Sequence, residues 1–311
     1  MSVHKTVLLN EAIEGLNLPI STAGGNSQFL VIDCTFGGGG HSAEICKRYP
    51  GIKLIALDQD KSVFSAQSGS ALGGERFKNC DISFVNENFR NLDKVNGENA
   101  DGIIFDLGLS SDQLENSLRG FSFMRKEPLL MTMKENPGRE DVTALDVVNN
   151  WEEESLADII YGYGEEKQAR RIAKAIVDFR KKQKIESTFD LVKIIEDTIP
   201  AKFRKGKIHF ATKTFQAIRI AVNDELGALN EGLEKGFKLL KTGGRMSVIS
   251  FHSLEDRIVK RFFSTKGGSA SGGKEYRVAN IITKKPTRAS DSEIKNNPRA
   301  RSAKLRILEK I

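Results

Sequence analysis

The sequence predicts an α/β protein in which a doubly wound, Rossmann-like parallel sheet is interrupted by an all-helical insertion. Three observations lead to this fold class. Apolar segments alternate with helical patterns through the first third of the chain, as they do in parallel βαβ units. No convincing strand pattern occurs between about Ser117 and Phe210. A strand pattern then returns at Arg245–Phe251 (RMSVISF), so the sheet receives strands from both sides of the insertion.

The first third contains four short segments rich in Ile, Leu, Val and Phe, and three of them end in aspartate. Segments of this length and composition are typical of strands buried in a parallel sheet. Helices are expected between them at His41–Lys47 and Lys61–Ala71. The expected strands are Gln28–Asp33, Lys53–Asp58, Ile82–Asn86 and Asp101–Asp106.

The central block places apolar residues at helical spacing, for example Leu156, Ile159 and Ile160. We therefore expect residues 117–210 to form a helical domain inserted into a sheet domain made of residues 1–116 and 211–311. After the insertion, apolar residues recur every three or four positions from Phe215 to Leu240. This spacing predicts one long helix, ended by the Thr242-Gly-Gly244 segment.

Composition limits the partners and the compartment. The net charge of +7 over 311 residues indicates either a polyanionic partner or a solvated basic surface. The basic segment Asn297–Arg306 is expected to be a last edge strand, a nucleic-acid contact, or both. Cys34, Cys46 and Cys80 suggest neither a disulfide framework nor a metal site, and indicate a reducing compartment. Without an apolar run near the roughly 18 residues that cross a membrane or a targeting pattern, we expect a cytoplasmic protein.

The most informative segment is Asp33-Cys-Thr-Phe-Gly-Gly-Gly-Gly-His-Ser42, in which a strand ends in an acid and four glycines precede a helix. Glycines there let a ligand approach bare backbone, and the helix start offers unpaired N–H groups. The spacing lacks the GxGxxG pattern of dinucleotide binders and is closer to the S-adenosyl-L-methionine (AdoMet) loop of class I methyltransferases. Asp58 ends the next strand, where an acid can accept hydrogen bonds from ribose hydroxyls. His41 is expected either to cap the helix or to contact a cofactor carboxylate.

Eight segments spread along the chain resemble one family, the RsmH (MraW) family of bacterial 16S ribosomal RNA cytosine-N4 methyltransferases. They occur in order and cover nearly the whole sequence. The segments are His4-Lys-Thr-Val-Leu-Leu-Asn-Glu11, Asp33-Cys-Thr-Phe-Gly-Gly-Gly-Gly-His-Ser42, Asp106-Leu-Gly-Leu-Ser-Ser-Asp-Gln-Leu114, Arg119-Gly-Phe-Ser-Phe123, Tyr163-Gly-Glu-Glu166, Ala211-Thr-Lys-Thr-Phe-Gln-Ala-Ile-Arg219, Ser250-Phe-His-Ser-Leu-Glu-Asp-Arg257 and Asn297-Pro-Arg-Ala-Arg-Ser302.

The resemblance implies a class I AdoMet-dependent methyltransferase with an inserted helical domain that recognises RNA. Its substrate would be a cytosine in the decoding centre of 16S rRNA, within the small ribosomal subunit. Monomer and homodimer both stay open. By motif, the AdoMet contacts would be Gly39, Gly40, His41, Asp58, Phe89, Asp106 and Gln113. From the residues alone, a core position is the favoured explanation of Phe89.

The same resemblance suggests substrate contacts. Asp106 is a weak candidate for orienting the cytosine amine, and no general base is assigned. Because residue 109 is leucine where many amino-methyltransferases have an aromatic, Phe121 or Phe123 would have to stack on the base. His252 is expected either to touch RNA or to orient its own loop.

The chain departs from the family pattern at two positions: Leu130 stands where an aspartate is usual, and Thr132 where an arginine is usual. If those two residues form a salt bridge in the family, losing both leaves no unpaired charge. If the acid took part in catalysis, activity would be lost. Two alternative functions stay open. The two departures motivate a non-enzymatic AdoMet- and RNA-binding ribosome assembly factor. The other alternative is a nicotinamide-dependent oxidoreductase, against which the missing GxGxxG spacing counts.

Overall fold

The computed structural model describes residues 5–19, 29–64, 75–95, 99–206, 208–268 and 277–311. The chain divides into two compact units. Unit 1 contains Met1–Gly108 and Leu226–Ile311, and unit 2 contains Leu109–Glu225. The expected helix Lys61–Ala71 lies largely outside the described residues.

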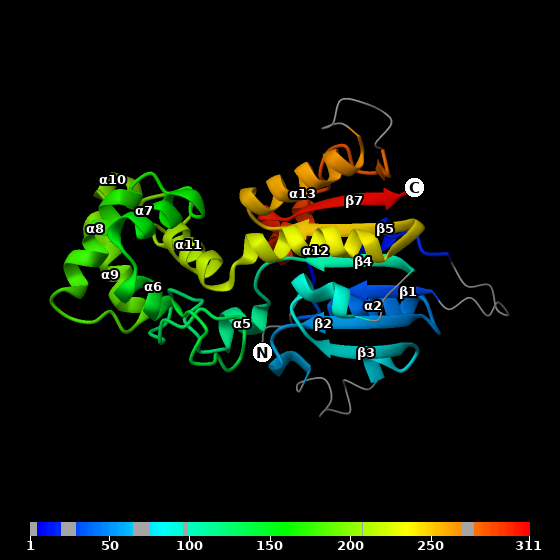
Figure 1. The fold of residues 1–311 in the computed structure, drawn as a ribbon, viewed down its shortest axis with the longest axis horizontal. Helices are drawn as coiled ribbons and strands as arrows, with labels where there is room; N and C mark the ends of the chain where they lie inside the picture. The colour runs from blue at the N-terminus through cyan, green and yellow to red at the C-terminus, as the bar shows by residue number, and fades with distance from the viewer. Residues whose placement is uncertain (1–4, 20–28, 65–74, 96–98, 207, 269–276) are drawn as a thin grey trace. The chain divides into compact units, whose positions relative to one another are not determined.

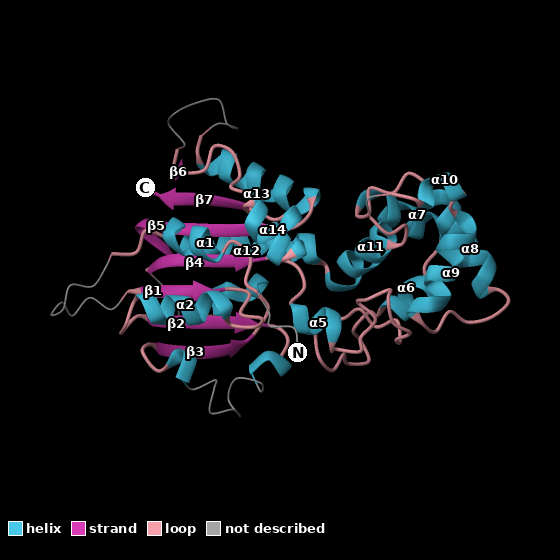
Figure 2. Cartoon of the chain, turned by 180° about the vertical axis from the view of Figure 1, so that it is seen from behind, coloured by secondary structure: helices cyan, strands magenta, loops and turns pink. Residues whose placement is uncertain are grey.

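Unit 1 is built on one seven-stranded sheet, whose strands run side by side in the order β3-β2-β1-β4-β5-β7-β6 (Figures 1 and 2). The strands from β3 to β5 pair in parallel, and β7 is antiparallel to both of its neighbours. The parallel βα pattern expected from the sequence is confirmed. The bounds are β1 Leu30–Asp33, β2 Lys53–Asp58, β3 Asp81–Asn86, β4 Ala100–Asp106, β5 Leu240–Ser250, β6 Ala279–Ile281 and β7 Lys304–Lys310.

Helices cover both faces of this sheet (Figure 2), and alternate strand residues supply the two cores. Ile32 and Ile103 pack with α12 and α13 residues such as Leu233. Val31 and Ile104, their neighbours along the strands, pack on the opposite side with α1 and α2. This alternation follows from the two-residue period of a strand. The helices are α1 Leu9–Gly15, α2 Gly40–Arg48, α12 Glu225–Leu239, α13 Ser253–Lys266 and α14 Asp291–Asn296, with short 3-10 helices η1 Phe89–Lys94 and η3 Pro298–Ser302.

Unit 2 is helical, and its described residues contain no named strand. Its core is a single cluster that includes Leu156, Ile172, Ile195 and Phe215. Ser187 and Thr143 each cap a helix, with the acid three residues later closing a capping box. The helices are α5 Ser111–Glu115, α6 Ala144–Asn150, α7 Glu153–Gly162, α8 Ala169–Arg180, α9 Thr188–Thr198, α10 Ala201–Arg204 and α11 Thr212–Asn223.

The unit boundaries differ from those expected, because unit 2 begins at Leu109 rather than 117 and ends at Glu225 rather than 210. The expected single helix from Phe215 to Leu240 is two helices. Asp224 has left-handed backbone angles (φ 45°, ψ 46°), which end α11 before α12 begins. Phe215 and Ile218 of α11 therefore belong to the core of unit 2.

Two smaller expectations are also wrong. Strand β5 begins at Leu240, so the Thr242-Gly-Gly244 segment lies inside a strand and does not precede it. The pairing of β5 with β4 is irregular between Leu240 and Arg245. The C-terminal basic segment ends in β7, which is not an edge strand because β6 pairs along its other side.

The prediction about cysteines is corrected as well: Cys46 and Cys80 form a disulfide, while Cys34 is a buried free thiol. The pair is 34 residues apart in sequence. Helix α2 and the turn before β3 bring the two Cα atoms to 5.2 Å, which is within the normal range for a disulfide. In the described part of the chain, no helix is long and apolar enough to span a membrane.

Candidate active site

Three strand ends of unit 1 place carboxylates at one edge of the sheet. Asp33 ends β1, Asp58 ends β2 and Asp106 ends β4, and these strands are parallel neighbours. The strand order reverses between β1 and β4. In open α/β sheets, ligands bind at such a switch point, outside the carboxyl ends of the strands.

The glycine-rich loop closes over this edge in a conformation that excludes side chains. Gly39 has a φ of +68°, and a Cβ there would lie 2.7 Å from the ring of Phe36. A Cβ on Gly40 would overlap the side chain of Thr6. Helix α2 begins at Gly40, and its N-cap residue Gly39 makes no side-chain cap, which is the arrangement in which a helix start such as the Gly40 N–H can serve a ligand. The expectation that His41 caps this helix is therefore wrong.

Asp33 is 1% exposed and fixes the start of α2. It accepts hydrogen bonds from the Ser42 hydroxyl at 2.6 Å and from the Thr35 N–H at 3.2 Å. Burial raises the pKa of Asp33 from its ordinary 3.8 to about 6, although these two hydrogen bonds oppose the rise. The carboxylate is thus held in an environment that disfavours negative charge.

Asp58 connects the second strand to the glycine-rich loop. Its carboxylate accepts the Gly37 N–H at 2.8 Å and the Asp60 N–H at 2.9 Å. Burial raises the pKa of Asp58 to about 6, again against the effect of the hydrogen bonds. A carboxylate has about four acceptor sites, so hydrogen bonds to two backbone groups leave room for a ribose hydroxyl.

Asp106 lies beside His41, with 3.6 Å between the His41 Nδ1 and the Asp106 Oδ2. His41 is 4% exposed. The other carboxylate oxygen of Asp106, Oδ1, is buried and has no hydrogen-bond partner. Burial raises the pKa of Asp106 well above its ordinary value, and the charges of Asp33 and Glu255 add to the rise. A buried, unsatisfied acceptor is costly and indicates a ligand that donates to it.

The two remaining predicted cofactor residues make intramolecular contacts. Phe89 meets the ring of Phe105 edge-on, with 5.6 Å between centroids, and its position leaves no room for a Cβ on Gly232 of α12. Gln113 belongs to unit 2, is 7% exposed, and closes the capping box of α5 through Ser110. These contacts fix both side chains in place.

The predicted stacking residues differ in exposure. Phe121 is 6% exposed and belongs to the core of unit 2, so its ring is not presented to a base. Phe123 is half-buried. Its ring stacks on His209 at 4.5 Å and lies at 81° to the ring of Phe215, with 5.5 Å between centroids.

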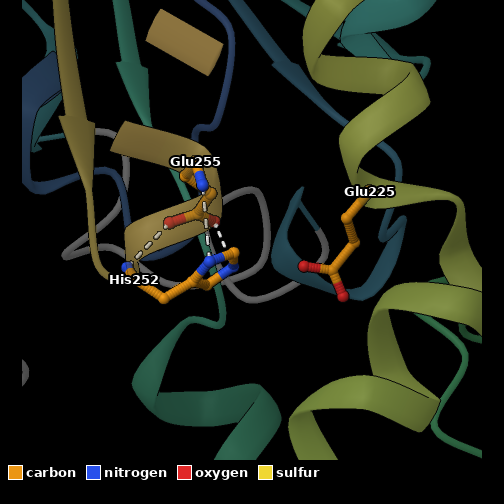
Figure 3. A group of neighbouring side chains, drawn as sticks. All are labelled: Glu225, His252 and Glu255. Atoms are coloured by element: carbon orange, nitrogen blue, oxygen red, sulfur yellow. Dashed lines mark hydrogen bonds and ion pairs between the residues drawn. The ribbon is translucent and has the colours of Figure 1, made fainter. Parts of the chain in front are cut away.

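His252 caps helix α13 and pairs with Glu255, as Figure 3 shows. The Glu255 N–H donates to the His252 Nδ1 at 3.4 Å, and the His252 Nε2 lies 3.3 Å from the Glu255 carboxylate. Both side chains are largely buried. This geometry accounts for His252 as the residue that orients its own loop, which was one of the two roles expected.

The C-terminal basic segment is partly tied to the sheet. Lys304 and Arg306 of β7 donate to Asp256 of α13 at 2.9 and 2.8 Å. Partial burial alone would raise the pKa of Asp256, but the hydrogen bonds from the two cations outweigh it and lower that pKa. These two cations therefore join β7 to α13.

The two unusual positions lie in a well-packed turn of unit 2. Thr132 is 4% exposed, and its hydroxyl donates to the Lys134 carbonyl at 3.1 Å. The buried guanidinium of Arg119 donates to the carbonyls of Thr132 and Met133. The guanidinium of Arg119 thus hydrogen-bonds to this turn, although residue 132 itself is not arginine.

Sequence reasoning missed two residues near the glycine-rich loop and Asp106. Glu255 adds negative charge near Asp106, and its signal is the His-x-x-Glu spacing of a capping box. Arg76 donates to the Gly38 and Gly39 carbonyls, and no sequence pattern singles it out.

The strand order, the single antiparallel strand and the glycine-rich loop after β1 define a class I methyltransferase. The chain belongs to the MraW methylase family, whose model matches residues 1–311.

Two similar proteins are each named "Ribosomal RNA small subunit methyltransferase H". One, from Carboxydothermus hydrogenoformans, is 46% identical over 99% of this chain and 98% of its own length. The other, from Symbiobacterium thermophilum, is 44% identical over 99% of this chain and 96% of its own length. A solved rRNA methylase from Streptococcus thermophilus aligns with 97% of this chain and 93% of its own, at 11% identity and a TM-score of 0.42.

Proposed function

We propose that this protein transfers a methyl group from AdoMet to the N4 atom of a cytosine in 16S rRNA, in the decoding centre of the small ribosomal subunit. Membership of the MraW methylase family and the names of its relatives support rRNA as the substrate. The N4 position and the decoding-centre site come from the resemblance of the eight segments.

The observation that carries the proposal is a set of three acids at the switch point, of which Asp33 is buried and Asp58 and Asp106 are partly buried. Asp33, Asp58 and Asp106 all have raised pKa values because of burial. A ligand that brings positive charge and hydrogen-bond donors would relieve this cost. AdoMet brings both, since it carries a sulfonium, an ammonium and two ribose hydroxyls. Its amino-acid part fits a loop in which Gly39 and Gly40 leave no room for side chains.

The same acids argue against a nicotinamide dinucleotide. Its pyrophosphate is anionic and would sit at the start of α2, next to Asp33 and near Asp106. Hydrogen bonds to the Asp58 carboxylate alone would not offset that repulsion. The oxidoreductase alternative is therefore disfavoured by charge as well as by the missing GxGxxG spacing.

The chain's own residues would hold both reactants. Gly39, Gly40 and His41 would hold the methionine part of AdoMet, and Asp58 the ribose. Phe89 and Gln113 are further AdoMet contacts by motif. When bound, AdoMet supplies an electrophilic methyl group, which the cytosine N4 lone pair takes up in a direct displacement. A conjugated amine is a poor nucleophile, so alignment and an acceptor for its N–H matter most.

The unsatisfied Oδ1 of Asp106 is the group we assign to orientation of the cytosine amine. Burial raises its pKa, so a bound cation would favour the charged carboxylate, which is the form that accepts the amine N–H. A buried Phe121 leaves the half-buried Phe123 as the aromatic candidate for base stacking.

Unit 2 is proposed to hold the RNA. Its surface carries exposed cations that make no ion pair among the described residues, including Arg170, Arg171, Lys182 and Lys184. Free cations of this kind contact phosphates. Thr132 is buried, and Arg119 donates to the carbonyls of Thr132 and Met133. These contacts favour a structural role for the two unusual positions, and so favour an enzyme over a non-enzymatic assembly factor.

Two experiments test the proposal. Calorimetry of the purified protein should detect AdoMet binding and no NAD binding, and binding of NAD instead would refute the cofactor assignment. In cells lacking the homologous enzyme, this chain should restore N4-methylcytidine to 16S rRNA. The variant Asp106→Asn should fail to do so, whereas Asp81→Asn, at an exposed aspartate of the same sheet, should succeed. An unmodified rRNA with AdoMet binding intact would favour the assembly-factor alternative.

A further inference from the structure

The segment Glu75–Cys80, which precedes β3, makes three separate connections to the glycine-rich loop and α2. None of its residues belongs to the family's motif segments. Its Arg76 hydrogen-bonds the loop backbone, its Phe77 packs under the loop, and its Cys80 is bonded covalently to α2. We propose that this segment is a brace for the cofactor loop, with Arg76 as a positioning residue and the Cys46–Cys80 disulfide as a redox-dependent lock.

The first connection is polar. The two terminal nitrogens of Arg76 donate to the Gly38 carbonyl at 3.3 Å and the Gly39 carbonyl at 3.1 Å. The Gly39 carbonyl also accepts the first hydrogen bond of α2, from the Ala43 N–H at 2.9 Å. Because a peptide group is planar, fixing the Gly39 carbonyl also fixes the direction of the Gly40 N–H. That N–H is one of the helix-terminal donors available to a ligand.

The second connection is apolar. The Phe77 ring is 6% exposed and lies 5.9 Å from the ring of Phe36. Both rings border Gly39, since a Cβ there would lie 2.7 Å from Phe36 and 3.1 Å from Phe77. The loop therefore rests on a packed aromatic surface, and a shift of Phe77 would move Gly39.

The third connection is the disulfide between Cys46 on the buried face of α2 and Cys80. Cys80 and Phe77 belong to one turn, because the Cys80 N–H donates to the Phe77 carbonyl at 3.2 Å. The disulfide thus fixes the turn that contains Phe77 against α2, the helix that follows the glycine-rich loop. Arg76, next to Phe77, is fixed with it. In reducing compartments, disulfides are usually transient and redox-sensing, which is the behaviour that a lock requires.

The bond would form by exchange with a low-molecular-weight disulfide such as oxidised glutathione. Cys80 is partly exposed and Cys46 is fully buried, so the Cys80 thiolate would attack first and release one glutathione thiolate. The Cys46 thiolate would then attack the Cys80 sulfur and release the second. Both protein thiols lose their protons to solvent, the two cysteines are oxidised, and one glutathione disulfide is reduced to two thiols.

The inference rests on the proposed AdoMet site, and calorimetry separates the two. Absence of AdoMet binding by the wild-type protein would overturn the proposed function, and the brace with it. With wild-type binding present, Arg76→Gln should weaken AdoMet binding about tenfold, the effect of losing a charge-assisted hydrogen bond. Arg76→Lys should recover part of the affinity. Lys78→Gln removes a charge from the same segment. Among the described residues Lys78 pairs only with Glu75, so this variant should bind like wild type.

Methylation kinetics provide a readout that a purely structural role would not move. Arg76→Gln should raise the KM for AdoMet and leave the KM for RNA unchanged. Equal affinities for wild type and Arg76→Gln, or a similar loss in Lys78→Gln, would overturn the assignment of Arg76.

The lock is tested with wild type in oxidised glutathione or dithiothreitol, with mass spectrometry to confirm the disulfide. Oxidised wild type should bind AdoMet about fivefold more tightly than reduced wild type, within the usual range of coupling between sites. Cys80→Ser should show no redox effect, and Arg76→Gln a smaller one. Failure of the disulfide to form, or equal affinities in the two states, would overturn the lock.

Discussion

Asp33 offers a direct test of the electrostatics at the switch point, because asparagine has the same shape without the charge. In the variant Asp33→Asn, the amide oxygen can still accept from the Thr35 N–H, and the amide nitrogen can donate to the Ser42 hydroxyl. The substitution therefore removes the buried charge and keeps both hydrogen bonds.

The magnitude follows from the pKa. Burial raises the pKa of Asp33 from 3.8 to about 6, which corresponds to about 3 kcal/mol at about 1.4 kcal/mol per tenfold change. The pKa of Asp33 is higher in the folded state than in the unfolded state. The stability that Asp33 contributes is therefore fully present below pH 3.8 and is lost as the pH rises through about 6. At pH 8, the AdoMet-free variant should be more stable than wild type by about 2–3 kcal/mol.

The assay is urea unfolding without AdoMet at a series of pH values from 4 to 8, with Asp81→Asn as the control. Wild type and the control should lose stability across this range, and Asp33→Asn should lose less. Asp33→Asn should bind AdoMet more weakly than wild type, although it is more stable without AdoMet, because it lacks a charge that attracts the cationic cofactor. Equal or lower stability of Asp33→Asn at pH 8 would refute the electrostatic reasoning.

Three further predictions concern the glycine-rich loop and helix α13. Gly40→Ala should destabilise the protein by about 1–3 kcal/mol through overlap with Thr6 and abolish AdoMet binding by calorimetry, whereas Gly162→Ala, where a Cβ meets nothing within 4 Å, should do neither. Asp256→Asn should cost about 3 kcal/mol in urea unfolding at pH 7, because it leaves a buried arginine of β7 without its ion pair; an unchanged midpoint would contradict this. His252→Ala should cost about 1 kcal/mol as a lost helix cap, and His252→Asn should restore stability and methylation together; activity lost in both variants would instead indicate an RNA contact.

The centre of the sheet could be predicted from the sequence because strands β1, β2 and β4 are buried along most of their length. Segments such as Lys53–Asp58 then read as continuous apolar runs, and the structure places this strand at the expected residues. The positions of Asp33, Asp58 and Asp106 at strand ends followed directly. Their proximity required only the rule that the carboxyl ends of parallel strands meet at one edge of the sheet.

The break at Asp224 could not be predicted, because the apolar spacing continues across it. A single residue with positive φ redirects the chain without changing the pattern of buried faces. The same limit applies to side-chain contacts. Nothing local in the sequence distinguishes Phe121, which is buried, from Phe123, which is half-buried against His209.

Contacts between residues distant in sequence were also out of reach. The Cys46–Cys80 bond depends on the packing of α2 beside the turn before β3, and Arg76 reaches the glycine-rich loop from 37 residues away. His41 contacts Asp106 because β1 and β4 are neighbours in the sheet, although α2, β2, β3 and η1 lie between these strands in the chain.

Methyl transfer to ribosomal subunits tests the central claim most directly. Purified protein, radiolabelled AdoMet and small subunits from a strain lacking the homologous enzyme are incubated together, and the 16S rRNA is digested to nucleosides. The account predicts label in N4-methylcytidine at one site, with wild-type Leu130 and Thr132 in place, and no label with Asp106→Asn. Label in a different nucleoside, or none despite AdoMet binding and even after Leu130→Asp and Thr132→Arg are introduced together, would contradict it.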